Sequence, residues 1–439
     1  MTATAASAEA RHWPLWAVSA AVPAAVIVAV LGAAAGLLWG SPQTVLVALP
    51  LAASVALTRL RRPAPGPITL HADVGGRAED SRLEYGIEIA AAPDVEAMQL
   101  RLSLLATAPS DVIVTRAAAR RITGSLPVLH SGPQEMVRLA SRAIGAGGQA
   151  LGEPSPEIVV RGSVAPKLLP IGSLPLPRRL TGLTGTHDSS RPGDGGEFRD
   201  IHLFAPGDRL RRIDWKTTAR RGSSPGDLYV RRSNATADVT LMLVVDSRDD
   251  VGENVADWSR GTAHGKGLGS MDIARTAASS IAAAYVQAGD RVGFQDLASP
   301  SRVIAPGGGN RHLQRVLRAV ELTQPSGASP YRLRAPLIPP GTLVWVFSTF
   351  LDDETARMAA LWRAAGHRVL AVDTLPRPNL SRLSRQGALA HRVVMMERDD
   401  RMRDLAATGV ERLEWQDSAS SSRAAALRSL ARLRGRGAR

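Results

Sequence analysis

The longest apolar segment of the chain runs from Trp13 to Thr58 and contains no Asp, Glu, Lys or Arg. In lipid every backbone polar group must be paired within the segment, so such a stretch is expected to be helical. It is too long for one membrane span, and the sequence GSPQ at 40–43 interrupts it. The pattern predicts two transmembrane helices, at about 13–39 and 44–60. The first is ample for a ~30 Å hydrocarbon core and the second is near the short limit.

The residues that flank these helices predict their orientation. Indole rings prefer the membrane interface, and cytoplasmic flanks carry an excess of Lys and Arg. Arg11 precedes the first helix and RLRR at 59–62 closes the second, whereas the turn between them has no cation. We therefore predict a plasma (inner) membrane protein with both termini in the cytoplasm. A signal peptide is the alternative, but a second apolar stretch follows at once. The expected interface residues are Trp13, Trp16, Trp39, Arg59, Arg61 and Arg62.

Between 63 and 180 the pattern changes to short segments in which apolar and polar residues alternate. LEYGIEIAA (83–91) and MQLRLSLLA (98–106) alternate in this way, and turn sequences such as APD and GEPSP separate such segments. Period-two alternation in short segments is typical of antiparallel strands. We predict a β-sandwich domain at 63–180. No cluster of titratable residues is apparent there, which favours a spacer or a protein-contact module.

From 238 to 417 apolar runs alternate with segments of helical periodicity. DVTLMLVVD (238–246) and TLVWVFSTF (342–350) are nearly unbroken apolar runs, as buried parallel strands are, and helical segments lie between the runs. The alternation predicts a doubly wound, mostly parallel α/β sheet. Ligand sites in such sheets lie at the carboxyl ends of strands. The loops of interest are therefore 246–250, 325–329 and 348–353.

Two further segments flank this α/β domain. Residues 181–237 contain an Arg-rich block, and residues 418–439 form a basic tail rich in Ser, Ala and Arg. The tail is expected to be partly helical and frayed. With residues 1–62 as a membrane anchor, the chain is predicted to have five segments.

Composition adds a strong positive charge and excludes cysteine chemistry. Lys and Arg number 54 against 40 Asp and Glu, which gives a formal charge of +14. This balance favours an anionic neighbour, namely nucleic acid, an anionic leaflet or an acidic protein. The chain has no Cys, so disulfides, thiolate metal sites and cysteine nucleophiles are excluded. No GxSxG or HExxH motif occurs, and we predict that the chain is not an enzyme.

The Arg-rich block carries a family signature. It reads GEFRDIHLFAPGDRLRRIDWKTTARRG at 196–222 and is followed by LYVRRSN. This sequence resembles the signature of the domain of unknown function 58 proteins. With the segment DIARTAASSIAAAYVQAGDRVGF and the turn PGGGNRHL, the resemblance covers about 185–415; Phe204 stands where the family usually has Tyr. The signature residues, which are also candidates for docking, are Glu197, Arg199, Pro206, Gly207, Asp208, Arg212, Asp214, Trp215, Lys216 and Arg220.

The resemblance implies a fold and a set of partners. It implies that the α/β domain is similar to a von Willebrand factor A module. It also implies association with MoxR-type AAA ATPases and with transglutaminase-like membrane proteins. Two membrane spans and an additional β-domain ahead of the signature suit that family.

The same resemblance raises the question of a magnesium site. Von Willebrand A modules hold Mg²⁺ through oxygen ligands from three loops, but here Arg248 stands at a Ser position. A guanidinium so placed repels Mg²⁺ unless carboxylates compensate, so no cofactor is expected. Three alternatives stay open: a standard Mg²⁺ site, recognition of a partner's carboxylate by Arg248, or a solvated loop. The positions of this degenerate site are Asp246, Arg248, Asp250, Ser329, Thr349, Asp352 and Asp353.

The Arg-rich block is most simply interpreted as an internally paired structural element. We expect Asp208 and Asp214 to pair with neighbouring arginines, and Trp215, Ile213 and Phe204 to form an apolar anchor. A docking surface and a phosphate-binding patch are the alternatives. The sequence favours a membrane-anchored, cytosol-facing interaction or adaptor protein whose partner is a MoxR-type AAA ATPase. A Mg-dependent von Willebrand A-type binding module and a membrane-tethered nucleic-acid binder, acting through the basic tail, are the other hypotheses.

Overall fold

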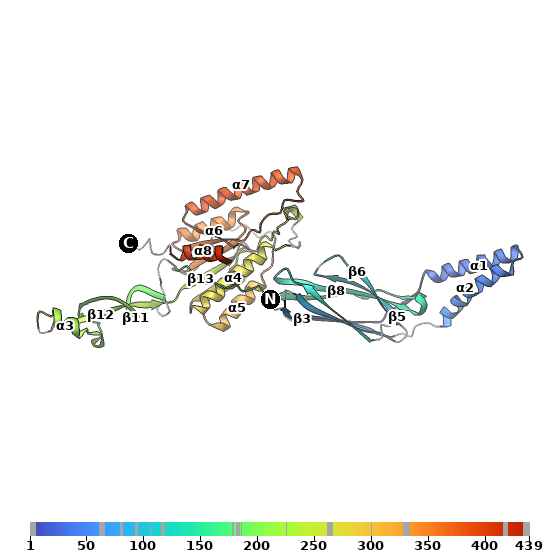
Figure 1. Ribbon diagram of the computed structural model, residues 1–439, viewed down its shortest axis with the longest axis horizontal. Coiled ribbons are helices and arrows are strands. Elements are labelled where there is room, and N and C mark those ends of the chain that lie inside the picture. Colours follow the sequence, from blue (N-terminus) through green and yellow to red (C-terminus); the bar gives the residue numbers. More distant parts are fainter. Residues whose placement is uncertain are drawn as a thin grey trace. The chain divides into compact units, whose positions relative to one another are not determined.

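The chain folds into two compact units, one of residues 1–128 with 133–165 and one of residues 129–132 with 166–439. Figure 1 shows the elements of the computed structural model. The structure describes residues 6–432 except 61–65, 80–81, 93–94, 106, 116–118, 178–179, 181–184, 186, 225, 261–266, 300, 328–333 and 416–419.

The first unit contains two antiparallel sheets around one apolar core. One sheet has the order β1 (Ala6–His12), β3 (Ile68–Glu79), β4 (Arg82–Ala90), β7 (Ala119–Pro127). The other has the order β2 (Trp16–Val18), β9 (Ala150–Gly152), β8 (Gly132–Gly145), β5 (Val95–Leu104), β6 (Ser110–Thr115), with β10 (Ile158–Val164) pairing with β8. Every second residue of the central strands is buried, as in β3, where Leu70, Ala72 and Val74 join the core. The predicted antiparallel sheets are confirmed.

Two of these strands precede the apolar helices, which the sequence did not indicate. β1 pairs with β3, and β2 pairs with β9 through Trp16 and Val18. The first helix, α1, therefore occupies Ala21–Leu38, and the prediction that it begins at Trp13 was wrong. Trp16 packs against the sandwich core instead of lying at a membrane interface, because strand pairing holds it there.

The helix α2 (Pro42–Leu60) packs beside α1, as Figure 1 shows. Gly36 permits this approach: a Cβ there would lie 2.5 Å from the hydroxyl oxygen of Thr44. Among the described residues only α1 is long and apolar enough to cross a membrane, since the apolar part of α2 is the shorter stretch Pro42–Ala56. The described residues thus support one span-length helix where two were predicted. Arg61 and Arg62 lie outside the described residues, as does the side chain of Arg59.

The second unit is built on a six-stranded, mostly parallel sheet. Its order is β15 (Val303–Gly307), β14 (Arg291–Asp296), β13 (Thr240–Val245), β16 (Leu343–Ser348), β17 (Arg368–Asp373), β18 (Glu411–Glu414). Only β15 is antiparallel to its neighbour. The order reverses between β13 and β16, which is the topological switch point of a doubly wound sheet.

Helices cover both faces of this sheet because alternate residues of each buried strand point to opposite sides. Leu241, Leu243 and Val245 of β13 pack on the side of α4 (Ser270–Gln287), α5 (Asn310–Glu321) and α8 (Ser420–Arg432). Met242 and Val244 pack on the side of α6 (Asp353–Ala364) and α7 (Arg385–Ala407). The tail was predicted to be partly helical and frayed. Residues 420–432 do form a helix, α8, but this helix is part of the core, since Leu427 and Leu430 are buried there.

A two-stranded ribbon forms a separate element of the second unit. β11 (His187–Leu203) pairs only with β12 (Tyr229–Ala237), and the signature sequence lies on β11 and on the segment between these strands. That segment contains the short helix α3 (Trp215–Arg221), which lies at the end of the ribbon in Figure 1. Short 3-10 helices occur at Ala146–Gly148, Leu210–Arg212 and Val255–Arg260.

Candidate functional site

The switch point of the α/β sheet brings β13 and β16 together at their carboxyl ends. Asp246 follows β13 directly, and Ser348 ends β16. The Ser348 hydroxyl donates a hydrogen bond of 2.8 Å to the Asp246 carboxylate, and the Thr355 hydroxyl donates another of 2.6 Å. Asp246 is thus the buried centre of the candidate site.

The guanidinium of Arg248 folds back onto this carboxylate. Its Nε donates to Oδ1 of Asp246 over 2.8 Å and its Nη2 donates to Oδ2 over 2.9 Å, which makes a two-point ion pair. Nη2 also donates to the Thr355 hydroxyl at 2.6 Å. The Arg248 side chain is only 9% exposed, so solvent screens the pair weakly.

The start of α6 supplies two further carboxylates. Asp352 caps this helix by accepting the backbone N–H of Glu354, and it lies 2.9 Å from Nη1 of Arg248. Glu354 accepts from the same Nη1 at 2.9 Å. Three carboxylates and one hydroxyl oxygen therefore surround a single guanidinium, and the chain supplies its own cation at the position where this type of sheet binds ligands.

The surroundings shift the acidity of these carboxyls in opposite directions. Burial acts to raise the pKa of Asp246, but hydrogen bonds and charge from Arg248 outweigh it and lower the pKa below its usual value. Burial raises the pKa of Asp249, and the nearby charges of Asp246 and Asp352 add to the increase. Burial also raises the pKa of Asp250. The ion pair thus keeps Asp246 ionised next to carboxyls that ionise less readily.

The predicted metal positions do not converge on one point. Asp250 accepts hydrogen bonds at the start of α4, from the Met271 N–H and the Ser270 hydroxyl. Asp353 is exposed and pairs with Arg401 of α7. Ser329 lies outside the described residues, and no group of three or more metal-binding side chains occurs among those that are described.

Thr349 is buried beside the cluster but takes no part in it. Its hydroxyl accepts a weak 3.4 Å bond from the Leu351 N–H, and its carbonyl accepts from Arg398. The residues present therefore do not fit the Mg²⁺ site of a von Willebrand A module, because Arg248 already satisfies Asp246 and Asp352. The same bonds speak against Arg248 as a receptor for a partner's carboxylate, since its guanidinium is engaged within the chain.

Glu354, Thr355 and Ser348 also belong to this cluster, although the sequence pattern did not predict them. They lie about a hundred residues from Asp246 and Arg248 in sequence, and pairing of β13 with β16 brings them together. The acidic sequence DDET at 352–355 contains the N-cap and the first residues of α6. Its second role, neutralising Arg248, becomes visible only when β13 and β16 are paired.

The Arg-rich block forms the end of the β11–β12 ribbon, and its carboxylates serve local turns. Asp214 caps α3 by accepting the Thr217 N–H at 2.9 Å. Asp208 accepts the Ala205 N–H at 2.9 Å, which lowers its pKa, and it lies 3.4 Å from Arg232 of β12. Asp208 thus pairs with an arginine of β12 and not with the expected Arg211, Arg212 or Arg220, while Asp214 serves as a helix cap.

The expected apolar anchor is also not formed. Trp215 is 68% exposed and Phe204 is 36% exposed, and neither belongs to an apolar core of the described residues. Arg212 donates to the Gly193 carbonyl, which ties the block to β11. Leu210, a third apolar residue of the block, is 67% exposed.

The remaining signature residues lie along the ribbon and its turn. Glu197 accepts from Asn234 across the strands at 2.8 Å. Arg199 lies 3.8 Å from Asp200. Gly207 follows Pro206 with φ of 100°, a conformation that favours glycine, so the PGD sequence is a turn. Lys216 and Arg220 are exposed on α3.

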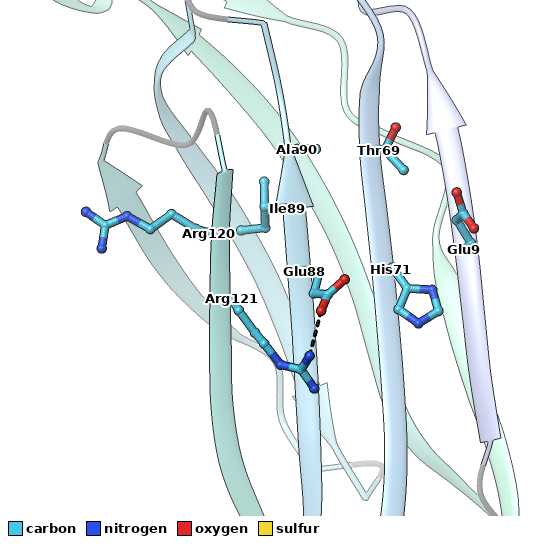
Figure 2. A pocket seen from close by; sticks show the side chains of 8 residues that line it. All are labelled: Glu9, Thr69, His71, Glu88, Ile89, Ala90, Arg120 and Arg121. Atoms are coloured by element: carbon cyan, nitrogen blue, oxygen red, sulfur yellow. Dashed lines mark hydrogen bonds and ion pairs between the residues drawn. The ribbon is translucent and has the colours of Figure 1, made fainter.

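The sandwich has a shallow polar hollow that the sequence did not reveal. Four strands place Glu9, His71, Glu88 and Arg121 in one row across the sheet, over a volume of about 600 Å³. Figure 2 shows the row, in which Arg121 donates to Glu88 at 2.6 Å. Because these residues come from four strands, no local motif signals them, and the prediction that the domain lacks a titratable cluster was wrong.

Comparison with known proteins identifies the second unit. A family described as "Protein of unknown function DUF58" matches residues 200–416. Uncharacterized proteins of Mycobacterium bovis and Mycobacterium tuberculosis are 30% identical over 236 residues, which is 50% of this chain and 69% of each relative. The chain belongs to the DUF58 family. No solved structure matches it significantly. The DUF58 match spans the ribbon from Asp200 onward and the α/β sheet, including both Trp215 and the Arg248 cluster.

Proposed function

We propose that this DUF58 protein is a membrane-anchored interaction protein that holds its α/β domain at the cytoplasmic face of the membrane. The observation that carries the proposal is the helix α1, which is 18 residues long, apolar and almost entirely exposed. A soluble protein gains by burying such a surface, whereas a lipid bilayer accepts it directly.

The position of α1 and α2 within the sandwich supports a hairpin anchor. The chain enters α1 from β2 and leaves α2 toward β3, and both strands belong to one folded unit. Residues on either side of the hairpin must therefore lie on the same side of the membrane. The flanking arginines of the sequence favour the cytoplasmic side.

The proposed partner is a protein, and the resemblance to the family makes a MoxR-type AAA ATPase the first candidate. The Arg248 cluster has a structural role in this proposal, because its polar groups are satisfied by one another. Its internal cation also makes binding independent of Mg²⁺, which separates this proposal from a metal-dependent module.

Anchoring is tested by placing a charge in the middle of α1. Val28 is 56% exposed, and Val28→Arg is expected to move the protein out of the washed membrane fraction, because Arg at a helix centre opposes insertion by about 2.5–3.5 kcal/mol. Val112→Arg, on an exposed position of β6, is the matched control and is expected to stay in the membrane fraction. Retention of Val28→Arg at the level of the control would refute the anchor.

The partner is tested by affinity capture of the full chain from gently solubilised membranes. We expect an AAA ATPase to be recovered with it and to be lost when the α/β domain is destabilised by Arg248→Ala. Repeated capture without any AAA ATPase would remove that partner from the proposal.

A further inference from the structure

The end of the ribbon presents an apolar and cationic surface that the fold does not use. We call it the tip cluster, and it consists of Leu210, Trp215, Lys216, Arg220 and Arg221. All five residues are exposed. Trp and Arg are the side chains that most often dominate binding energy at protein interfaces.

The tip cluster is positively charged because the acidic side chains near it bond to the backbone. The carboxylates of Asp208, Asp214 and Asp227 all accept backbone N–H groups of local turns. By contrast, Lys216, Arg220 and Arg221 make no ion pair within the described part of the chain. The acids therefore bond to the backbone of local turns, and α3 carries an excess of exposed positive charge beside the exposed Trp215.

A groove between α6 and α7 has the opposite character. Its volume is about 600 Å³, and four carboxylates against two guanidiniums line it. Asp353 pairs with Arg401 and Asp400 pairs with Arg403, whereas Glu397 and Asp404 have no ion-pair partner in the described structure. These two acids are seven residues apart on α7, so they lie on one face, about 10 Å apart.

Apolar residues also line this groove, and we refer to them as its apolar floor: Ala356 and Ala360 of α6 and Leu405 of α7. The groove thus combines apolar residues with an excess of acidic ones, and the tip cluster combines apolar residues with basic ones. The two surfaces are complementary in both charge and polarity.

We propose that the tip cluster of one copy of this chain docks into the α6–α7 groove of a second copy. The contact joins two different surfaces, so it is heterologous and links copies head to tail. Trp215 packs on the apolar floor, and the cations of α3 pair with Glu397 and Asp404. This inference stands apart from the membrane anchor, since both surfaces belong to the α/β unit.

The chain has no Cys, which allows a direct test by crosslinking. Ala219→Cys labels the tip and Thr408→Cys labels the groove, and both positions are exposed and uncharged. In detergent solution a short bismaleimide is expected to couple full-length Ala219→Cys to full-length Thr408→Cys when the two are mixed. Val303→Cys, 51% exposed on β15, replaces the groove variant as the control for random collision. Crosslinking no stronger than this control overturns the proposal.

Charge reversal separates specific docking from general stickiness. Arg220→Glu with Arg221→Glu on the tip partner is expected to reduce the crosslink about tenfold, and Glu397→Lys with Asp404→Lys on the groove partner is expected to do the same. Combining both reversed partners is expected to restore at least half of the yield. Circular dichroism first identifies the reversed variants that are folded. Failure of the rescue between folded variants overturns the proposal.

Other occupants give distinct results. Coupling of Ala219→Cys to itself in the absence of the groove variant indicates a symmetric tip contact and contradicts the head-to-tail arrangement. The tip variant can also be labelled in the presence of vesicles. If phosphatidylglycerol vesicles protect Ala219→Cys from labelling, and neither phosphatidylcholine vesicles nor a second copy of the chain does so, the tip binds anionic lipid and the proposal is wrong.

Discussion

Arg248 determines what the carboxyl end of this sheet can do. At a sheet edge that otherwise offers Asp, Ser and Thr oxygens, one guanidinium reaches Asp246, Asp352 and Glu354. A buried carboxylate is costly unless a positive charge pairs with it, and here a side chain of the same loop supplies that charge. Arg248 therefore ties the loop after β13 to the start of α6.

Loss of Arg248 is expected to destabilise the α/β domain strongly. Arg248→Ala leaves Asp246 buried and unpaired, and breaking a buried pair in this way typically weakens folding by about 3–5 kcal/mol. Thermal unfolding followed by circular dichroism should show a clear fall in the midpoint. Arg211→Ala is the control, because Arg211 is exposed and unpaired within the described residues. Equal midpoints for the two variants would show that the cluster contributes nothing to stability.

The lowered pKa of Asp246 predicts a dependence of stability on pH. Its ionised form is favoured in the folded state, so its contribution is complete above the ordinary carboxyl value of about 3.9 and is lost as the pH falls through the lower folded value. The midpoint difference between the wild type and Asp246→Asn should be constant from pH 5 to 7 and shrink below about pH 4.

Asp249 provides a control of opposite sign for this titration. Its pKa is raised, so its ionised form opposes folding at neutral pH. Asp249→Asn is therefore expected to hold or increase the midpoint at pH 7, with the gain disappearing in acid. A parallel loss of stability in both variants would contradict the assignment of opposite shifts.

At the scale of elements, hydropathy patterns predicted the sheets well and the helices less completely. Buried strands such as 240–245 and 343–348 are apolar on both faces, so composition alone identifies them. The helix α7 was missed because its first half exposes Leu389, Val393 and Met396 and has no clean polar face. β2 was not predicted because it is a strand of only three apolar residues next to an apolar helix, so its hydropathy is the same as that of the helix. Only its pairing with β9 shows that it is a strand.

The helix α8 is expected to stabilise the domain despite its polar composition. Leu427 is 2% exposed in the core that also contains Trp415, and Arg423 stacks on that ring at 5.0 Å. Leu427→Ala should weaken folding by about 2–5 kcal/mol, as buried Leu truncations do. Leu361→Ala, 41% exposed on α6, is the matched control. A midpoint for Leu427→Ala no lower than that of the control would show that α8 does not stabilise the domain.

At the scale of the whole molecule, the order of elements limits how the chain can meet a membrane. β1 and β2 belong to the sandwich, yet they precede the apolar hairpin in sequence. The two helices thus lie between strands of one folded unit. The sequence gives no local signal for this order, because the short strands at 6–18 have no partner until β3 and β9 are placed.

Together with the proposed anchor, this order predicts that residues 6–18 are retained in the protein recovered from membranes. Cleavage after α1, as a signal peptidase would perform, removes β1 and β2 and leaves the edges of β3 and β9 unpaired, which exposes backbone groups and apolar core surface. Mass spectrometry of the protein extracted from membranes should therefore detect peptides from 6–18. A product that begins near Gly40 would show that the hairpin is a processed signal and that the sandwich closes without its first two strands.

Deletion of residues 6–12 should likewise lower the unfolding midpoint of the sandwich, because seven strand residues and their pairing with β3 are lost together.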